Sequence, residues 1–213
     1  MIKVMPLGDS ITAGVEFING KSTCENGGYR THLWEKARAG DLMIDFIGSR
    51  SDGPSHIARG HEGHPGWTTS GLLENIDRWL GEYEPQVILL MTGINDLIRD
   101  RGPVTATQRL NDLVQRIFHI QSEVCLIVAS VPPLKWSMSR GQLDPLVMRY
   151  NSEIPHIVEA YASSGSSVYF LDVYNALAEE HLLGTHPSPS GYRKIAEIWY
   201  PSLKELVAEL ESR

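Results

Sequence analysis

Three short polar segments of this chain contain the residue types that serine-dependent hydrolysis requires. Ser10 can supply a nucleophilic hydroxyl, His186 an imidazole that takes its proton, and Asn95 an amide that donates to an oxyanion. Two of these residues also have an interpretation without chemistry: Gly-Asp-Ser is a common turn sequence, and Asn95 could cap a short helix. The order of the segments favours a hydrolase site in which Ser10 and His186 are catalytic and Asn95 holds the oxyanion.

The sequence around these residues predicts strands that alternate with helices. Apolar runs predict five strands, at residues 4–7, 43–47, 86–92, 124–131 and 167–171. Helical patterns separate them, at residues 29–39, 68–80, 105–121, 144–162 and 188–211. This alternation predicts a single α/β domain over residues 1–213, with a parallel sheet covered on both faces.

The carboxyl ends of the strands are the predicted place for the site. Ligands of open parallel sheets bind beyond that edge. Ser10 follows the first predicted strand and Asn95 the third, so both should emerge there, and His186 can join them from the last loop. Residues 11–26 are expected to be a loop. Residues 48–66, with five glycines, three histidines and two prolines, are also expected to form a surface loop.

Composition limits the classes of partner. A formal charge of −7 without a basic run argues against nucleic acid and against an anionic membrane surface. No apolar run approaches the roughly 18 residues of a membrane span. The strand-like start at residues 1–7 predicts a cytoplasmic protein, or a secreted one if a leader has been removed. Cys24 and Cys125 form no disulfide framework, which leaves their redox state and the compartment open.

Two further features have competing interpretations. His61 and His64 lie three residues apart among glycines, not on the helix of a His-Glu-x-x-His zinc motif, so a loop that supports the site is preferred to a metal centre. No metal is predicted. Trp67 and Trp136 lie in predicted loops, where they could line a substrate cleft or simply pack against the protein.

Four blocks in order along the chain resemble the SGNH, or GDSL-type, hydrolase superfamily. The matching blocks are Gly-Asp-Ser at 8–10, Gly66, Gly-Ile-Asn-Asp at 93–96 and His-Pro at 186–187. Residues 5–12, 27–30 and 61–67 are also similar to the acetyl-xylan-esterase branch of carbohydrate esterases.

The resemblance implies a fold and a mechanism. The expected fold is a flavodoxin-like three-layer α/β/α sandwich with a five-stranded parallel sheet of order 2-1-3-4-5. The expected oxyanion hole consists of the main-chain N–H groups of Ser10 and Gly66 with the side chain of Asn95. Neither a metal nor an organic cofactor is expected for the chemistry.

One position departs from the family pattern. The family usually places an aspartate three residues before the catalytic histidine, to orient the imidazole, and this chain has Leu183 there. A main-chain carbonyl near Leu183 could replace it in a Ser-His dyad. A displaced carboxylate could instead reach His186, or activity could be poor. The carboxylates considered as supporting groups or possible acids are Asp9, Asp172, Glu179 and Glu180.

The preferred function is a serine esterase that hydrolyses short acyl esters, acetyl above all, of carbohydrates. Its partner would be a small-molecule or carbohydrate ester, and the oligomeric state is left open. The absent aspartate motivates one alternative, a carbohydrate-binding protein without turnover. A second alternative is a lysophospholipase or thioesterase, although the loops contain few apolar side chains for a long acyl tunnel.

Overall fold

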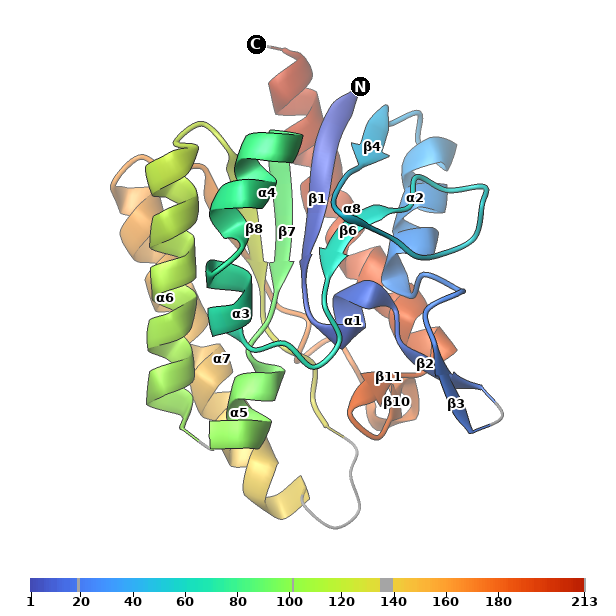
Figure 1. Ribbon diagram of the computed structural model, residues 1–213, viewed down its shortest axis with the longest axis vertical. Helices are drawn as coiled ribbons and strands as arrows, with labels where there is room; N and C mark the ends of the chain where they lie inside the picture. Colours follow the sequence, from blue (N-terminus) through green and yellow to red (C-terminus); the bar gives the residue numbers. More distant parts are fainter. Residues whose placement is uncertain (19, 101, 135–139, 213) are drawn as a thin grey trace.

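A mostly parallel sheet forms the centre of the fold, with one antiparallel pair at its edge (Figure 1). The structure is a computed structural model that describes residues 1–18, 20–100, 102–134 and 140–212, without the side chains of residues 140–143 and 179. The five predicted strands are β1 (Ile2–Gly8), β4 (Ile44–Phe46), β7 (Val87–Met91), β8 (Cys125–Ala129) and β9 (Val168–Leu171). β1 pairs with β4 and β7, and β8 lies between β7 and β9. The predicted order 2-1-3-4-5 is confirmed for these five strands, but the sheet has seven strands in the described part of the chain, not the five predicted.

The glycine-rich segment 48–66 is not the surface loop that its composition predicts. It contains β5 (Arg50–Ser51) and β6 (Gly60–Gly63), which pair with each other. β4 pairs with the first residues of β1, and β6 pairs in parallel with the last residues of β1. Its glycines allow close packing: a Cβ on Gly60 would lie 2.4 Å from the Phe46 carbonyl oxygen, and one on Gly63 would lie 2.3 Å from the Ala13 nitrogen. The prediction was wrong because close packing selects the same residue as a flexible loop.

Residues 11–26 also contain regular structure. Helix α1 (Ser10–Ala13) follows β1, and β2 (Glu16–Ile18) forms an antiparallel ladder with β3 (Lys21–Thr23). A second two-stranded ladder, from β10 (Leu182–Leu183) and β11 (His186–Pro187), lies near the other end of the chain. These short ladders were not predicted, because two or three residues are too few to show a periodic pattern.

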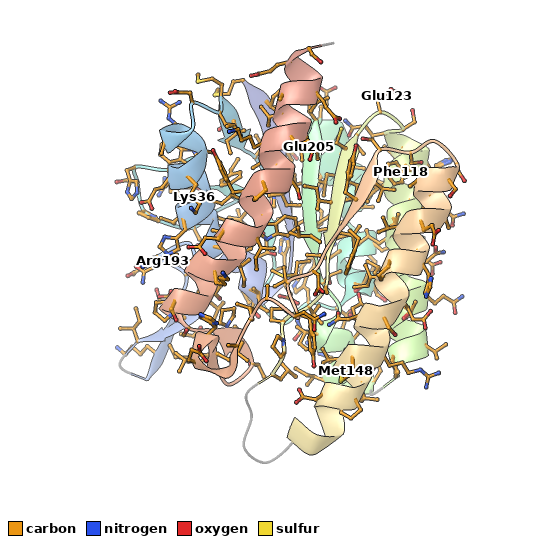
Figure 2. All side chains as sticks on the ribbon, turned by 180° about the vertical axis from the view of Figure 1, so that it is seen from behind. Lys36, Phe118, Glu123, Met148, Arg193 and Glu205 are labelled. Carbon is orange, nitrogen blue, oxygen red and sulfur yellow. The ribbon has the colours of Figure 1, made fainter. Side chains whose placement is uncertain are left out.

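Helices cover both faces of the sheet, which confirms the three-layer α/β/α sandwich. On one face lie α3 (Thr69–Leu73), α4 (Ile76–Tyr83), α6 (Pro103–Ile120) and α7 (Arg140–Ser163). On the other face lie α2 (Tyr29–Ala39) and α8 (Pro189–Glu211). Figure 2 shows α8 beside α2, with Lys36 on α2 and Arg193 and Glu205 on α8. Among the described residues, no helix is both long and apolar enough to span a bilayer.

Each face of the sheet has its own apolar cluster. The cluster under α3, α4, α6 and α7 contains Trp79 and Ile117, and the cluster under α2 and α8 contains Ile195 and Trp199. All residues of β7 and β8 are buried, as expected for central strands covered on both sides. The buried strands hold their carboxyl ends in fixed positions, and the site is built on that edge.

Candidate active site

Ser10 lies at the carboxyl edge of β1, at the start of α1. The Asp9 side chain caps this short helix by accepting a hydrogen bond of 3.0 Å from the Ile11 N–H. A Cβ at Gly8 would lie 2.2 Å from the Met91 carbonyl oxygen, so only glycine allows β1 to approach β7 here. The strand end and the helix cap together fix the backbone of Ser10, whose side chain is half-buried.

Arg30 holds the other end of α1, a role that sequence reasoning did not assign. Its buried guanidinium donates to the carbonyl oxygens of Thr12 at 2.9 Å and Ala13 at 3.1 Å, and it also reaches the carbonyls of Asp52 and Arg59. Burial lowers the pKa of Arg30 to about 10. Its position after Gly27 and Gly28, in a segment that resembles other esterases, was the available signal.

His186 reaches Ser10 from the second ladder. A hydrogen bond of 2.9 Å joins His186 Nε2 to Ser10 Oγ, although 176 positions separate the two residues. Burial lowers the pKa of the imidazole below its ordinary value of 6.5. At neutral pH the ring is therefore neutral and able to accept a proton.

The second ring nitrogen contacts a hydroxyl. Thr185 Oγ1 lies 3.1 Å from His186 Nδ1, in the place for which the sequence suggested a main-chain carbonyl or a displaced carboxylate. The side chain of Leu183 is exposed, and its backbone pairs with that of His186. No sequence pattern marks Thr185 for this role, because the family pattern places the orienting group at position 183.

The carboxylates suggested as displaced acids lie elsewhere or cannot be placed. Asp172 accepts hydrogen bonds from the Ser130 hydroxyl and from Asn175. Glu180 is exposed, and the side chain of Glu179 lies outside the described residues. Within the described part of the chain, no carboxylate hydrogen-bonds to His186.

Asp9 is a buried carboxyl group beside the site. Burial raises its pKa to about 7, and the nearby charge of Asp96 adds to the shift, while the hydrogen bond from the Ile11 N–H opposes it. Because its side chain caps α1, we assign Asp9 a supporting role in holding Ser10.

Gly66 lies in a tight turn attached to the end of β1. The Trp67 N–H donates to the His64 carbonyl at 3.1 Å, and Pro65 and Gly66 occupy the middle of this turn, with Gly66 at φ +79°. A proline followed by a left-handed glycine is the pattern of a type II turn. The His64 N–H donates to the Gly8 carbonyl at 2.9 Å, which places the turn beside the strand that leads to Ser10.

Asn95 is hydrogen-bonded to the same turn. It lies in the first turn of α5 (Ile94–Asp100), directly after β7, and its side-chain Nδ2 donates to the Trp67 carbonyl at 2.9 Å. An amide nitrogen carries two N–H bonds, so one donor is left for a ligand. Arg99 on the same helix donates to the Gly66 carbonyl at 2.6 Å. Ser10, Gly66 and Asn95 thus belong to three hydrogen-bonded segments at one edge of the sheet.

Asp96, the residue after Asn95, fixes the position of α5 through buried hydrogen bonds. Its fully buried carboxylate accepts from the Thr69 N–H at 2.9 Å, from the Thr69 hydroxyl at 3.0 Å and from Arg109 at 2.9 Å. These bonds tie α5 to α3 and α6. Sequence reasoning noted Asp96 beside Asn95 but assigned it no role.

The segment from His61 to His64 packs inside the protein. Glu62 is buried and accepts hydrogen bonds from the Ser49 hydroxyl and from His64 Nε2, each at 2.8 Å. Burial lowers the pKa of His61 to about 2, and its Nδ1 accepts from the Gly63 N–H at 3.0 Å. Among the described residues, no group of three His, Cys, Asp or Glu side chains could hold a metal ion.

The two tryptophans suggested as cleft residues differ in what can be said of them. Trp67 is half-buried and stacks on His64 with ring centroids 4.2 Å apart, and His64 in turn stacks on Trp79 at 4.9 Å. The Trp67 ring is thus one layer of an aromatic stack with His64 and Trp79. Trp136 lies outside the described residues.

A sequence comparison identifies a family for this arrangement. The profile of the GDSL-like lipase/acylhydrolase family matches residues 7–194, a range that contains all four blocks. The chain is 36% identical over 133 residues to a protein of Acetivibrio thermocellus provisionally named endoglucanase X, and 26% identical over 230 residues to a multidomain esterase of Ruminococcus flavefaciens. These matches cover 61% and 95% of this chain, which spans 54% and 28% of the length of those relatives.

Solved structures have the same fold over nearly the whole chain. A family 3 carbohydrate esterase of Clostridium thermocellum superimposes with a TM-score of 0.82 at 34% identity, over 98% of both chains. An acetyl esterase, solved as a serine-to-alanine mutant with an acetate ion, superimposes with a TM-score of 0.81 at 25% identity, over 99% of this chain and all of the other.

Proposed function

The chain belongs to the GDSL-like lipase/acylhydrolase family, and we propose that it is a serine esterase that removes acetyl groups from carbohydrate esters. The observation that carries the proposal is the hydrogen bond of 2.9 Å between Ser10 Oγ and His186 Nε2. The acyl group and the carbohydrate are supported by similarity to an acetyl esterase and to a family 3 carbohydrate esterase.

In the proposed mechanism His186 is the proton carrier. The Thr185 hydroxyl accepts from Nδ1–H, which leaves the lone pair of Nε2 free to receive the Ser10 proton. As that proton leaves, Ser10 Oγ bonds to the acetyl carbon. The main-chain N–H groups of Ser10 and Gly66 and the Asn95 amide then donate to the oxyanion.

The tetrahedral intermediate collapses as the bond from carbon to the alcohol oxygen breaks. His186 returns its proton to that oxygen, and the alcohol leaves an acetyl group on Ser10. Water then takes the place of the alcohol: His186 removes a proton from it, the water oxygen bonds to the acetyl carbon, and acetate departs as Ser10 regains its proton. His186 thus acts as base and acid in both halves of the reaction, and Ser10 with His186 forms a dyad that the Thr185 hydroxyl orients.

Release of acetate from p-nitrophenyl acetate and from acetylated xylan tests this proposal. Ser10→Ala should abolish both reactions, and Ser163→Ala, which removes an exposed hydroxyl on α7, is the matched control and should retain them. A phosphonylating reagent should label the wild-type chain once, at Ser10, and should fail to label Ser10→Ala.

Two results would contradict the proposal. If Ser10→Ala kept most of the activity, Ser10 would not be the nucleophile. If the wild-type chain bound acetylated xylan but released no acetate, the carbohydrate-binding alternative would replace the esterase.

A further inference from the structure

A pocket of about 180 Å³ opens beside His186, where two short ladders meet. Phe17 and Ile18 of β2 line it from one side, and Leu183 and Pro187 of the β10–β11 ladder line it from the other. Glu16 and Asn26 supply its polar lining. Figure 1 shows both ladders next to each other, at the end of the sheet where α1 begins.

Three apolar side chains of this pocket are unusually exposed. Phe17 is 57% exposed, Ile18 46% and Leu183 55%. Burial in the core does not account for them, and exposed apolar side chains that gather in one hollow are a common feature of binding grooves. The Phe17 ring also meets the His186 imidazole edge-on, with centroids 5.5 Å apart and planes at 67°. The apolar lining of the pocket therefore contacts His186, the proposed proton carrier.

The position of the pocket relative to His186 decides which half of an ester it can receive. In acyl transfer the histidine must give its proton to the oxygen of the leaving alcohol, so the alcohol lies on the imidazole side of the nucleophile. The oxyanion donors Gly66 and Asn95 belong to the turn after β6 and to α5. Figure 1 shows α5 on the opposite side of α1 from the two ladders.

We propose that this pocket binds the alcohol half of the ester, and that it selects a neutral alcohol with an apolar face, the chemistry of a pyranose ring. The inference rests on the proposed esterase function and names the substrate feature that the site recognises. The carbon–hydrogen face of a sugar ring can pack on Phe17 and Leu183, while its hydroxyls can reach Glu16 and Asn26.

Leu183 has a positive role in this proposal. It occupies the position where the family usually has aspartate, and its exposed side chain forms part of the wall beside His186. At this position the family aspartate would orient the imidazole, whereas Leu183 of this chain would contact the substrate. The Thr185 hydroxyl contacts Nδ1 instead.

Glu16 gives this pocket a preference for neutral alcohols over anionic ones. Its carboxylate accepts a hydrogen bond of 2.6 Å from the Asn26 amide and lies in the lining of the pocket. A carboxylate at this place repels an anionic alcohol, and the repulsion is weakened but not removed by solvent. Esters of neutral alcohols should therefore be preferred to esters whose alcohol half carries a negative charge.

The test varies one half of the ester at a time. Ethyl acetate and 2-naphthyl acetate share the acetyl group and differ in the alcohol, whereas p-nitrophenyl acetate and butyrate share the alcohol and differ in the acyl group. For each variant, kcat/KM is compared with that of the wild-type chain on the same ester, so that differences in leaving-group chemistry cancel. An acetylated methyl xyloside tests the pyranose ring directly.

Phe17→Ala and Leu183→Ala should lower kcat/KM for 2-naphthyl acetate and the xyloside by about tenfold, which corresponds to the loss of one apolar contact of ~1.4 kcal/mol. The value for ethyl acetate should stay within about twofold, because that alcohol is too small to reach both side chains. Val104→Ala, which truncates a 63% exposed apolar residue on α6, is the matched control and should change none of these values. Glu16→Gln should raise kcat/KM for 4-acetoxybenzoate relative to phenyl acetate.

Four results would overturn the proposal. An equal loss on every ester would mean that Phe17 only orients His186, and a change confined to the acyl series would place the acyl group in the pocket. No change on any ester would show that the pocket takes no part in binding. A wild-type chain that hydrolyses no ester would remove the proposed function and this subsite with it, a result distinct from the first three.

Discussion

The Thr185 hydroxyl beside His186 Nδ1 replaces a charged group with a neutral one. A carboxylate at this place would orient the ring and also stabilise its protonated form, whereas a hydroxyl can orient the ring but adds no negative charge. This agrees with the pKa of His186, which burial lowers. The proposed dyad would therefore work with a weaker base than a charged triad provides.

Thr185→Val tests the orienting role of the hydroxyl. Valine keeps the shape of threonine and removes the hydrogen bond to Nδ1, which is worth about 0.5–1.5 kcal/mol, so kcat should fall about two- to twelvefold. KM should change little, because Thr185 is proposed to act on the imidazole and not on the substrate. Thr185→Ser should restore most of kcat. Full activity in the valine variant would show that the hydroxyl does not position His186.

The downward shift of the His186 pKa predicts the acid limb of the pH profile. Only the neutral imidazole can take the Ser10 proton, so activity is present above the pKa and lost as the pH falls through it. With the pKa below 6.5, the midpoint of the acid limb of kcat/KM for a neutral ester should lie below pH 6.5. Asp9→Asn should leave this midpoint in place. A midpoint above pH 6.5 would contradict a base shifted by burial alone.

At the scale of elements, the site depends on the residues at which each strand ends. Gly8 ends β1 where any side chain would meet the Met91 carbonyl, and Gly93 comes after β7 with φ +119°. A Cβ at Gly93 would lie 2.4 Å from the Tyr150 ring, which packs against the strand end and donates to the Thr92 carbonyl at 2.9 Å. The two glycines allow the chain to turn sharply into α1 and α5, and those turns present Ser10 and Asn95.

The Asp9 cap of α1 makes stability depend on pH. In the native chain Asp9 keeps its proton up to about pH 7, whereas the unfolded chain loses it near the ordinary value of 3.8. A raised native pKa contributes stability at low pH, and that stability is lost as the pH rises through this window. Asp9→Asn has no proton to lose and can still accept from the Ile11 N–H.

The wild-type chain should therefore lose unfolding free energy relative to Asp9→Asn as the pH rises from about 4 to 7. The slope should approach ~1.4 kcal/mol per pH unit. Denaturant unfolding at several pH values measures it, and Asp41→Asn serves as the control for an exposed aspartate. A difference that stays constant with pH would mean that Asp9 is ionised in the native state throughout.

At the scale of the whole molecule, the sheet separates two apolar clusters. Ile117 of α6 lies in one and Ile195 of α8 in the other, and both are fully buried. The active-site edge uses both layers: α5 and the turn at Gly66 adjoin the first cluster, while His186 precedes α8 and the second. Stability of the site therefore depends on both faces of the sheet.

Ile117→Val and Ile195→Val test this separation. Each removes one buried methylene and should cost about 0.5–1.5 kcal/mol. Because the sheet lies between the two residues and they share no contact cluster, the double variant should lose the sum of the two to within ~0.5 kcal/mol, with an unchanged denaturant slope. A larger deviation from additivity would show that the sheet transmits strain between the layers.

The central strands, the long helices and the candidate reactive residues could be predicted from the sequence alone, whereas the single helix predicted at 68–80 is two helices, α3 and α4. Strands buried on both faces require continuous apolar runs, so β7 and β8 were recognisable without any knowledge of their partners. Ser10, Asn95 and His186 were recognisable because hydrolysis requires their functional groups. Their common edge followed from the rule that parallel strands present their carboxyl ends together.

The surroundings of these residues could not be predicted from the sequence. The pairing of β6 with β1, the hydroxyl at His186 Nδ1 and the pocket between the β2–β3 and β10–β11 ladders all depend on segments that meet across the fold. Glycines and short polar segments are compatible with loops, ladders and close packing alike, so they leave no periodic signal of their partners. Long-range contacts select among these conformations, and they turned Leu183, a departure from the family pattern, into part of a pocket wall.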